Sequence, residues 1–373
     1  MSDETPEADR APGAPHPRDT ARLFGQETAE SAFLGAWTAG RMHHAWLLSG
    51  PRGVGKATLA WRLARFLLAA PEDDGGMFAP PPPASLDIPD GHPVARRMRA
   101  MAEPRLFLLR RPWDEQAKRL RAVIPVDEVR RMQGFLRLSA ADGGRRAVIV
   151  DAAEDMNPEA ANAMLKLLEE PPRGVTFLMV SHQPMRLLPT IRSRCRALAC
   201  APLAPDALAA ALAQAGVDAG GDAAALAELS GGSAGEAIRI VEGGGVALYA
   251  ALVRLFSARP QADRGAALAL AEAAGRGGAE AFDLTVQMID RLLARVARAG
   301  AQGAPPPEAA PGEAALLVRL APDRHAAVRW ADLAQTLGAR ARAGRAVNLD
   351  PAALVLDMLL RIDAAAAAPG RSA

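Results

Sequence analysis

The chain has 373 residues, half of them hydrophobic, a formal net charge of +2 and only two cysteines. The length is enough for roughly two or three domains, and the nearly balanced charge predicts no strong overall attraction to nucleic acid. Two cysteines, Cys195 and Cys200, exclude a four-cysteine zinc site and do not suggest a secreted disulfide scaffold.

The N-terminal stretch, residues 1–20, is acidic and proline-rich and contains no apolar segment. This composition predicts a disordered tail rather than a signal peptide or a transit peptide. No apolar run in the chain approaches the roughly 18–20 residues that span a bilayer. A soluble protein in a reducing, cytoplasmic setting is therefore expected.

Between residues 21 and 200, short apolar strands alternate with amphipathic helices, which predicts an α/β fold with a parallel sheet flanked by helices. The strands are continuous apolar runs, as in sheets that are buried on both faces. Residues 71–105 interrupt the alternation with a proline-rich stretch, predicted to be loop or linker. The expected strands are 44–49, 105–110, 145–151, 175–181 and one within 191–200, and the expected helices are 28–40, 56–70, 125–140 and 157–172.

The ends of two helices are marked by their sequence. Asn157 can cap the helix at 157–172, and Pro158 fits its first position. From residue 202 onward the pattern is helical throughout, and a last helix is expected with Asp350 as its cap and Pro351 at its first position. The C-terminal part of the chain is therefore predicted to be all-helical.

A glycine-rich loop joins the strand at 44–49 to the helix that follows it. The segment "GPRGVGK" matches G-x-x-x-x-G-K, a loop whose backbone amides cradle phosphate oxygens at the positive end of a helix. Only three of the 44 basic residues are lysines, so chance rarely places a lysine in this loop. The candidate nucleotide-binding residues in the loop are Gly50, Gly53, Gly55 and Lys56. An ordinary glycine turn is the structural alternative.

The run "NAMLKLLEEPP" followed by "TIRSRC" closely resembles the bacterial clamp-loader branch of the AAA+ ATPases. The segments "FGQE" and "HHAWLLSGPRGVGKATLA" resemble earlier boxes of the same family. The resemblance implies an AAA+ P-loop domain at 21–200, a small helical lid domain at 201–243 and an all-α collar domain for oligomerisation at 244–373.

The resemblance also implies partners and cofactors. The partners would be gamma/tau and delta subunits in a hetero-oligomeric ring, and the sliding clamp and primed DNA would be reached through that complex. ATP or ADP would bind weakly, without hydrolysis. Many relatives carry a four-cysteine zinc module where this chain has residues 71–105 without a cysteine, so no zinc is expected.

Three departures from the active family pattern predict that this chain does not hydrolyse ATP. Ala57 stands where a Ser or Thr would hold magnesium. Asp151 occupies the place of the magnesium carboxylate, but Ala152 follows it where active members carry a Glu that activates water. Gly235 replaces the arginine with which active members sense the nucleotide.

By the same resemblance, Arg194 of the "SRC" motif is an arginine finger that acts on the ATP site of a neighbouring subunit, with Arg192 and Arg196 as support. A planar and permanently charged guanidinium suits that role. An ordinary exposed arginine is the structural alternative. Cys195 is interpreted as a packed thiol rather than a nucleophile, and Glu169 and Glu170 as helix-surface partners of Lys166.

Two other functions remain open from the sequence. The chain could be an active clamp-loader ATPase that uses Thr58 and Glu154 in a shifted register. It could also be a small-molecule P-loop kinase with the proline-rich stretch as its lid. The helical C-terminal third, which shows no substrate-binding motif, argues against the kinase.

Overall fold

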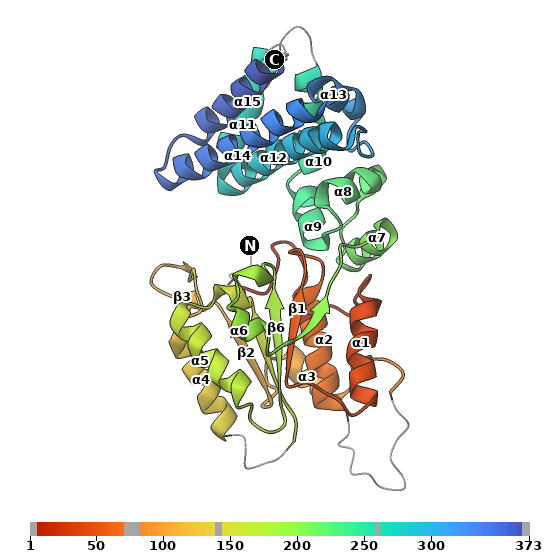
Figure 1. Cartoon of the computed structure of the whole chain (residues 1–373), viewed down its shortest axis with the longest axis vertical. Coiled ribbons are helices and arrows are strands. Elements are labelled where there is room, and N and C mark those ends of the chain that lie inside the picture. The colour runs from red at the N-terminus through yellow and green to blue at the C-terminus, as the bar shows by residue number, and fades with distance from the viewer. Residues whose placement is uncertain (1–5, 71–82, 139–143, 258–261, 368–373) are drawn as a thin grey trace. The chain divides into compact units, whose positions relative to one another are not determined.

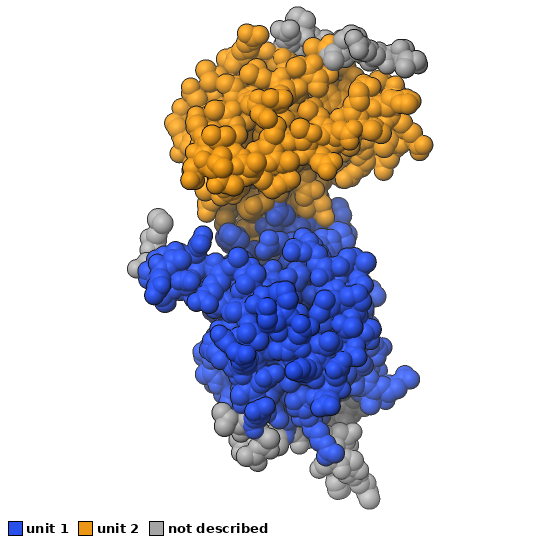
Figure 2. All heavy atoms as spheres, turned by 60° about the vertical axis from the view of Figure 1, so that its left-hand side comes forward, with its two compact units in different colours: residues 1–216, 232–236 blue, residues 217–231, 237–373 orange. Residues whose placement is uncertain are grey.

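A computed structural model describes residues 6–70, 83–138, 144–257 and 262–367. The chain divides into two compact units, residues 1–216 with 232–236 and residues 217–231 with 237–373, coloured separately in Figure 2. The finer boundaries expected at residues 200 and 243 stay predictions.

The first unit is built on a parallel five-stranded sheet with the order β2-β5-β6-β1-β7 (Figure 1). Its central strands are apolar runs without alternation, and all six residues of β5 are buried, as expected for a sheet covered on both faces. A short antiparallel hairpin of β3 and β4 follows β2. The strands are β1 (Ala45–Ser49), β2 (Leu106–Arg110), β3 (Trp113–Asp114), β4 (Arg119–Leu120), β5 (Arg146–Asp151), β6 (Val175–Ser181) and β7 (Arg196–Ala199).

Helices cover the two faces of this sheet and bury separate apolar clusters. One cluster joins α1, α2 and α3 to the sheet around Trp46 and Trp61, and the other joins α4 and α5 to it around Phe177 and Met164. The helices of this unit are α1 (Glu27–Thr38), α2 (Lys56–Ala69), α3 (Pro93–Arg99), α4 (Val126–Leu138), α5 (Pro158–Glu169), α6 (Pro189–Arg192) and α7 (Pro205–Gln214). The α/β fold class predicted from the sequence is confirmed.

The prediction that residues 71–105 are loop or linker is wrong over α3. The His92 side chain caps this helix by accepting a hydrogen bond from the Val94 amide, and Pro93 takes the first position. Val94 and Met98 are buried in the core. Their burial stabilises the helix, although the nearby prolines predict a loop. Residues 71–82 lie outside the described residues.

The prediction of a disordered tail at 1–20 is also wrong for residues 6–20. A short 3-10 helix, η1 (Pro17–Asp19), packs against α2 and α3, and the side chains of Asp9 and His16 are buried. Tertiary ion pairs hold this segment, although it contains almost no apolar side chains. Residues 1–5 lie outside the described residues.

The second unit is helical throughout its described residues. Its longest helices, α12 and α14, pack against each other. Asp350 and Pro351 open the last helix as predicted, with the Asp350 carboxylate accepting from the Ala352 amide at 3.1 Å. The remaining helices of the chain are α8 (Ala223–Ser230), α9 (Ala234–Glu242), α10 (Gly245–Ser257), α11 (Arg264–Arg276), α12 (Gly278–Gln302), α13 (Glu313–Leu320), α14 (Arg324–Ala346) and α15 (Pro351–Ala367).

In the parts of the chain that the structure describes, no single helix is long and apolar enough to cross a membrane. The helix pair α9 and α10 passes that test only when the two are taken together, and it is bent by 76°.

Candidate nucleotide site and interface arginine

The loop between β1 and α2 has a backbone conformation that favours glycine at three of its positions. Gly50, Gly53 and Gly55 have φ values of 147°, 75° and 100°. A Cβ atom would lie 2.1 Å from the Cys200 carbonyl oxygen at Gly50 and 2.2 Å from the Ser233 Oγ at Gly53. The glycines predicted from the sequence are therefore required by this loop, whose backbone amides are the groups that would contact phosphate.

Lys56 begins α2 and is turned back onto its own loop. Its Nζ donates to the carbonyl oxygen of Gly50 at 2.8 Å and to that of Pro51. Burial lowers the pKa of Lys56 to about 8, although the nearby Asp151 carboxyl opposes that shift. A phosphate would have to compete with two carbonyl groups for this ammonium.

Gln26, in the "FGQE" segment, fixes the base of the loop. Its side chain donates to the carbonyl oxygens of Val54 at 3.0 Å and Ala201 at 2.8 Å, and it accepts from the Ala201 amide at 3.1 Å. It thereby ties the loop to the segment that follows β7.

Asp151 ends β5 with its side chain buried. Its pKa is raised to about 8, first by burial and then by the negative charge of Asp9, while Lys56 acts in the opposite direction. Burial thus favours the protonated form of this carboxyl when no cation lies beside it. The next residue, Ala152, is buried and supplies no base.

Glu154 is engaged by the backbone of the turn after β6. Its Oε1 accepts from the His182 amide at 2.7 Å and the Gln183 amide at 3.1 Å. Through Oε1 it links the turn after β5 to the turn after β6, while its Oε2 is buried without a hydrogen-bond partner. The shifted-register ATPase required Glu154 to be free as a base, so the geometry gives that alternative no support.

Gly235 packs directly on the glycine-rich loop between β1 and α2. Its amide donates to the Gly53 carbonyl oxygen at 3.1 Å, and a Cβ on Gly235 would lie 3.2 Å from the Gly53 Cα. An arginine at this position would require the two segments to separate. The close contact between Gly235 and Gly53 thus depends on the lack of a side chain at position 235.

The loop residues suit a phosphate, but the residues around them do not complete a magnesium site. Ala57 offers no hydroxyl, Asp151 is buried with a raised pKa, and the Oε1 of Glu154 is engaged by two backbone amides. Across the described residues, no cluster of three or more His, Cys, Asp or Glu side chains could hold a metal ion.

Arg194 lies in the turn between α6 and β7, with its side chain 35% exposed. Its Nη2 pairs with the Glu169 carboxylate of α5 at 2.8 Å, and its Nη1 donates to the Thr190 carbonyl oxygen at 3.0 Å. Glu169 thus pairs with Arg194 and not with Lys166 as predicted, because the chain brings the turn against the end of α5.

The two arginines expected to support Arg194 point to other partners. Arg192 donates to the Met185 Sδ at 2.7 Å, and the Arg196 guanidinium stacks 4.9 Å from the centre of the Trp46 ring. Cys195 packs against Met179, and burial raises its pKa to about 12, as expected for an inert thiol. Arg194 is therefore the only one of the three that the structure ties to α5.

Residues 25–204 match a family model described as DNA polymerase III, delta subunit. The DNA polymerase III subunit delta' of Pseudomonas aeruginosa is 41% identical over 157 residues, which cover 42% of this chain and 43% of that protein. The Escherichia coli K12 subunit of the same name is 31% identical over 231 residues, covering 56% of this chain and 58% of that protein. The E. coli K12 tau subunit is 32% identical over 179 residues, covering 48% of this chain and 25% of that protein. The chain thus spans between a quarter and three fifths of these relatives' lengths.

Proposed function

We propose that this protein, whose residues 25–204 match the DNA polymerase III delta subunit model and resemble delta' subunits, is a non-hydrolysing subunit of a clamp-loader ring. It completes the ring with gamma/tau and delta subunits, and it supplies Arg194 to the ATP site of a neighbour. The ring opens the sliding clamp and places it on primed DNA. The protein is in this way a component of the DNA polymerase III holoenzyme. The polymerase activity, which is that of a DNA-directed nucleotidyltransferase, belongs to the whole complex.

The observation that carries the proposal is the state of Glu154. Ala152 stands where active members carry the base, and Glu154 accepts two backbone amides through its Oε1, which directs this carboxylate to the turn after β6. We infer that the chain's own site lacks a positioned base for hydrolysis. Loss of a positioned base costs about 10²–10⁴ in rate. ATP or ADP binds weakly at most, because Lys56 is already engaged by carbonyl groups.

The other half of the proposal rests on the position of Arg194. Its guanidinium is held from two sides and is still partly exposed, so it can exchange one partner for a phosphate on another molecule. An arginine finger contributes about 10³–10⁵ in rate at the site that it serves.

The test is ATP hydrolysis by the reconstituted ring with wild-type chain, with Arg194→Ala and with Arg194→Lys. We expect the rate at the neighbouring site to fall about 10³-fold or more with both variants, because lysine lacks the planar fork. Assembly of the ring, followed by size-exclusion chromatography, should be unchanged. Arg192→Ala serves as the matched control, since Arg192 contacts Met185 and should leave turnover unaltered.

The isolated chain should hydrolyse no ATP. Hydrolysis by the isolated chain that disappears with Lys56→Ala would overturn the non-hydrolysing assignment and restore the active ATPase. A ring whose turnover is indifferent to Arg194→Ala would instead overturn the assignment of the arginine finger.

A further inference from the structure

Residues 7–18 run across the edge of the sheet at which a nucleotide would bind. We propose that this segment, called the latch, occupies that edge in the free protein, held there by ion pairs of Glu7 and Asp9 with arginines of the chain, and that ATP binds appreciably only when the latch is displaced. The inference goes beyond the proposed function and does not depend on Arg194.

The first anchor of the latch is Arg110, the last residue of β2. Arg110 is in register with Asp151 on β5, so the two lie side by side at the carboxyl edge of the sheet. Arg110 pairs with Glu7 at 2.9 Å and also with Asp9. The latch thus brings two carboxylates to the edge where β5 ends.

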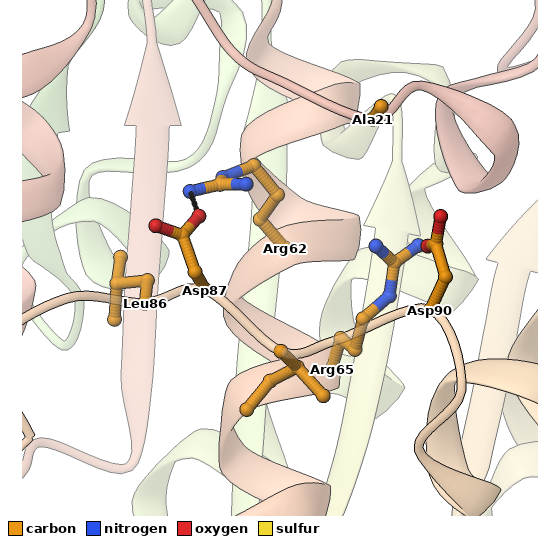
Figure 3. A pocket seen from close by; sticks show the side chains of 7 residues that line it. Ala21, Arg62, Arg65, Leu86, Asp87 and Asp90 are labelled. Atoms are coloured by element: carbon orange, nitrogen blue, oxygen red, sulfur yellow. Dashed lines mark hydrogen bonds and ion pairs between the residues drawn. The ribbon is translucent and has the colours of Figure 1, made fainter.

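The second anchor is α2, the helix that begins at Lys56. The Trp61 Nε1 donates to Asp9 at 3.4 Å, and the Arg65 guanidinium donates to the Arg18 carbonyl oxygen at 2.7 Å. Arg65 also lines a pocket of about 190 Å³ in which the neighbouring Arg62 pairs with Asp87 (Figure 3). Both ends of the latch are therefore fastened to the same helix.

The two ends of the latch also contact each other. The side chain of Asp9 is completely buried and lies 3.3 Å from the His16 Nε2, and Glu7 pairs with Arg18 at 2.9 Å. Burying a carboxylate is costly unless it is paired. A tail that merely trailed along the surface would leave these acids in water.

The middle of the latch reaches the phosphate-binding loop. A Cβ on Gly235 would lie 3.5 Å from the Ala11 Cβ and 3.2 Å from the Gly53 Cα, so Ala11 and the loop meet at one glycine. Glu7 and Asp9 are paired with Arg110, which lies in register with Asp151. The latch therefore contacts both the loop and the strand end at which a nucleotide would bind.

The experiment measures binding of Mg–ATP to the full chain by isothermal titration calorimetry. The Glu7→Gln/Asp9→Asn double variant removes both carboxylates with little change in shape, and we expect its Kd to be at least tenfold lower than that of the wild type. The control is Glu115→Gln, which removes an acid from an exposed ion pair with Lys118 in the same unit. Its Kd should equal that of the wild type.

Limited trypsin digestion of the same proteins reports on the latch itself. Cleavage after Arg10 and Arg18 should be faster in the double variant, while circular dichroism of the core is unchanged. Faster cleavage with no gain in affinity overturns the proposal, because the latch would then be open without admitting nucleotide. Unchanged cleavage overturns it as well, because the ion pairs would not be what holds the segment.

Arg110→Gln provides a second route should the double variant misfold. This variant removes the partner of Glu7 and Asp9 on β2. As in the double variant, trypsin cleavage should be faster and the Kd for Mg–ATP lower. An Arg110→Gln protein that is folded and readily cleaved but has wild-type affinity contradicts the latch.

Discussion

Asp151 links the stability of the first unit to pH. Its folded-state pKa of about 8 is far above the ordinary aspartate value of 3.8, so the folded state keeps a proton that the unfolded state has lost between these pH values. The stabilisation is complete below the unfolded pKa and is lost as the pH rises through about 8. His182, whose pKa burial lowers to about 4, has the opposite effect between pH 4 and 6.5. Lys56, whose pKa burial lowers to about 8, opposes Asp151 mainly above pH 8, so the contribution of Asp151 is the larger one between pH 6.5 and 8.

We expect the free energy of unfolding of the wild type to fall by about 1–2 kcal/mol over that window, at up to ~1.4 kcal/mol per pH unit for one proton. Asp151→Asn should show a flatter profile, because its amide does not titrate. Urea unfolding of both proteins at pH 6.5, 7.25 and 8 measures the difference. Parallel profiles would mean that Asp151 ionises in the folded state near its ordinary pKa.

Single residues also show where a sequence pattern stops being informative. The glycines of the phosphate-binding loop could be predicted because a motif of seven residues fixes their spacing. The engagement of Lys56 and Glu154 by backbone groups could not, because their partners lie in loops whose course depends on the whole sheet. The pairing of Glu169 with Arg194 likewise joins residues 25 positions apart, whereas its predicted partner Lys166 lay one helical turn away.

Elements with strong local signals were predicted well. Strand β6 has the bounds that its apolar run predicts, and Asn157 caps α5 by accepting from the Ala160 amide at 2.8 Å. Helix α3 and residues 6–20 were missed for one physical reason: their order comes from burial against α2 and from ion pairs across the fold. Proline and acidic content predicts disorder only when no such partners are available.

In the second unit, a buried carboxylate joins several elements. Glu313 at the start of α13 has no exposed surface, and its carboxylate accepts from the Arg295 Nε of α12 and from the Tyr249 hydroxyl of α10, each at 2.6 Å. It also accepts from the Ala309 amide at 2.6 Å, which fixes the connection that enters α13. Three helices and a loop thus depend on one charge.

We expect Glu313→Gln to destabilise this unit by about 3–5 kcal/mol, because it leaves the buried Arg295 guanidinium without its strongest partner. Glu272→Gln, at an exposed pair with Arg276 on α11, should cost no more than about 0.5 kcal/mol. Urea unfolding followed by far-ultraviolet circular dichroism measures both. Equal, small effects would show that Arg295 is satisfied by its other partners, Glu228 and the Pro307 carbonyl oxygen.

At the scale of the whole molecule, the two units have separate cores, one formed by the sheet and its flanking helices and the other by packed helices. Units with their own cores commonly unfold as separate cooperative steps, and a single free energy of unfolding then does not describe the chain. We therefore expect two transitions in scanning calorimetry of the full chain. Glu313→Gln should lower only one of them, by about 6–12 °C for a loss of ~3 kcal/mol in a unit of this size.

The matched change in the first unit is Leu59→Ala, which removes a completely buried side chain from α2. It should cost about 2–5 kcal/mol and lower only the other transition. If the chain instead melts in one transition that both variants shift, the units unfold cooperatively. Asp151, Glu313 and the latch would then all contribute to a single free energy of unfolding of the whole chain. Two independently shifted transitions would confine the pH dependence of Asp151 to the unit that carries Arg194, leaving the helical unit indifferent to pH between 6.5 and 8.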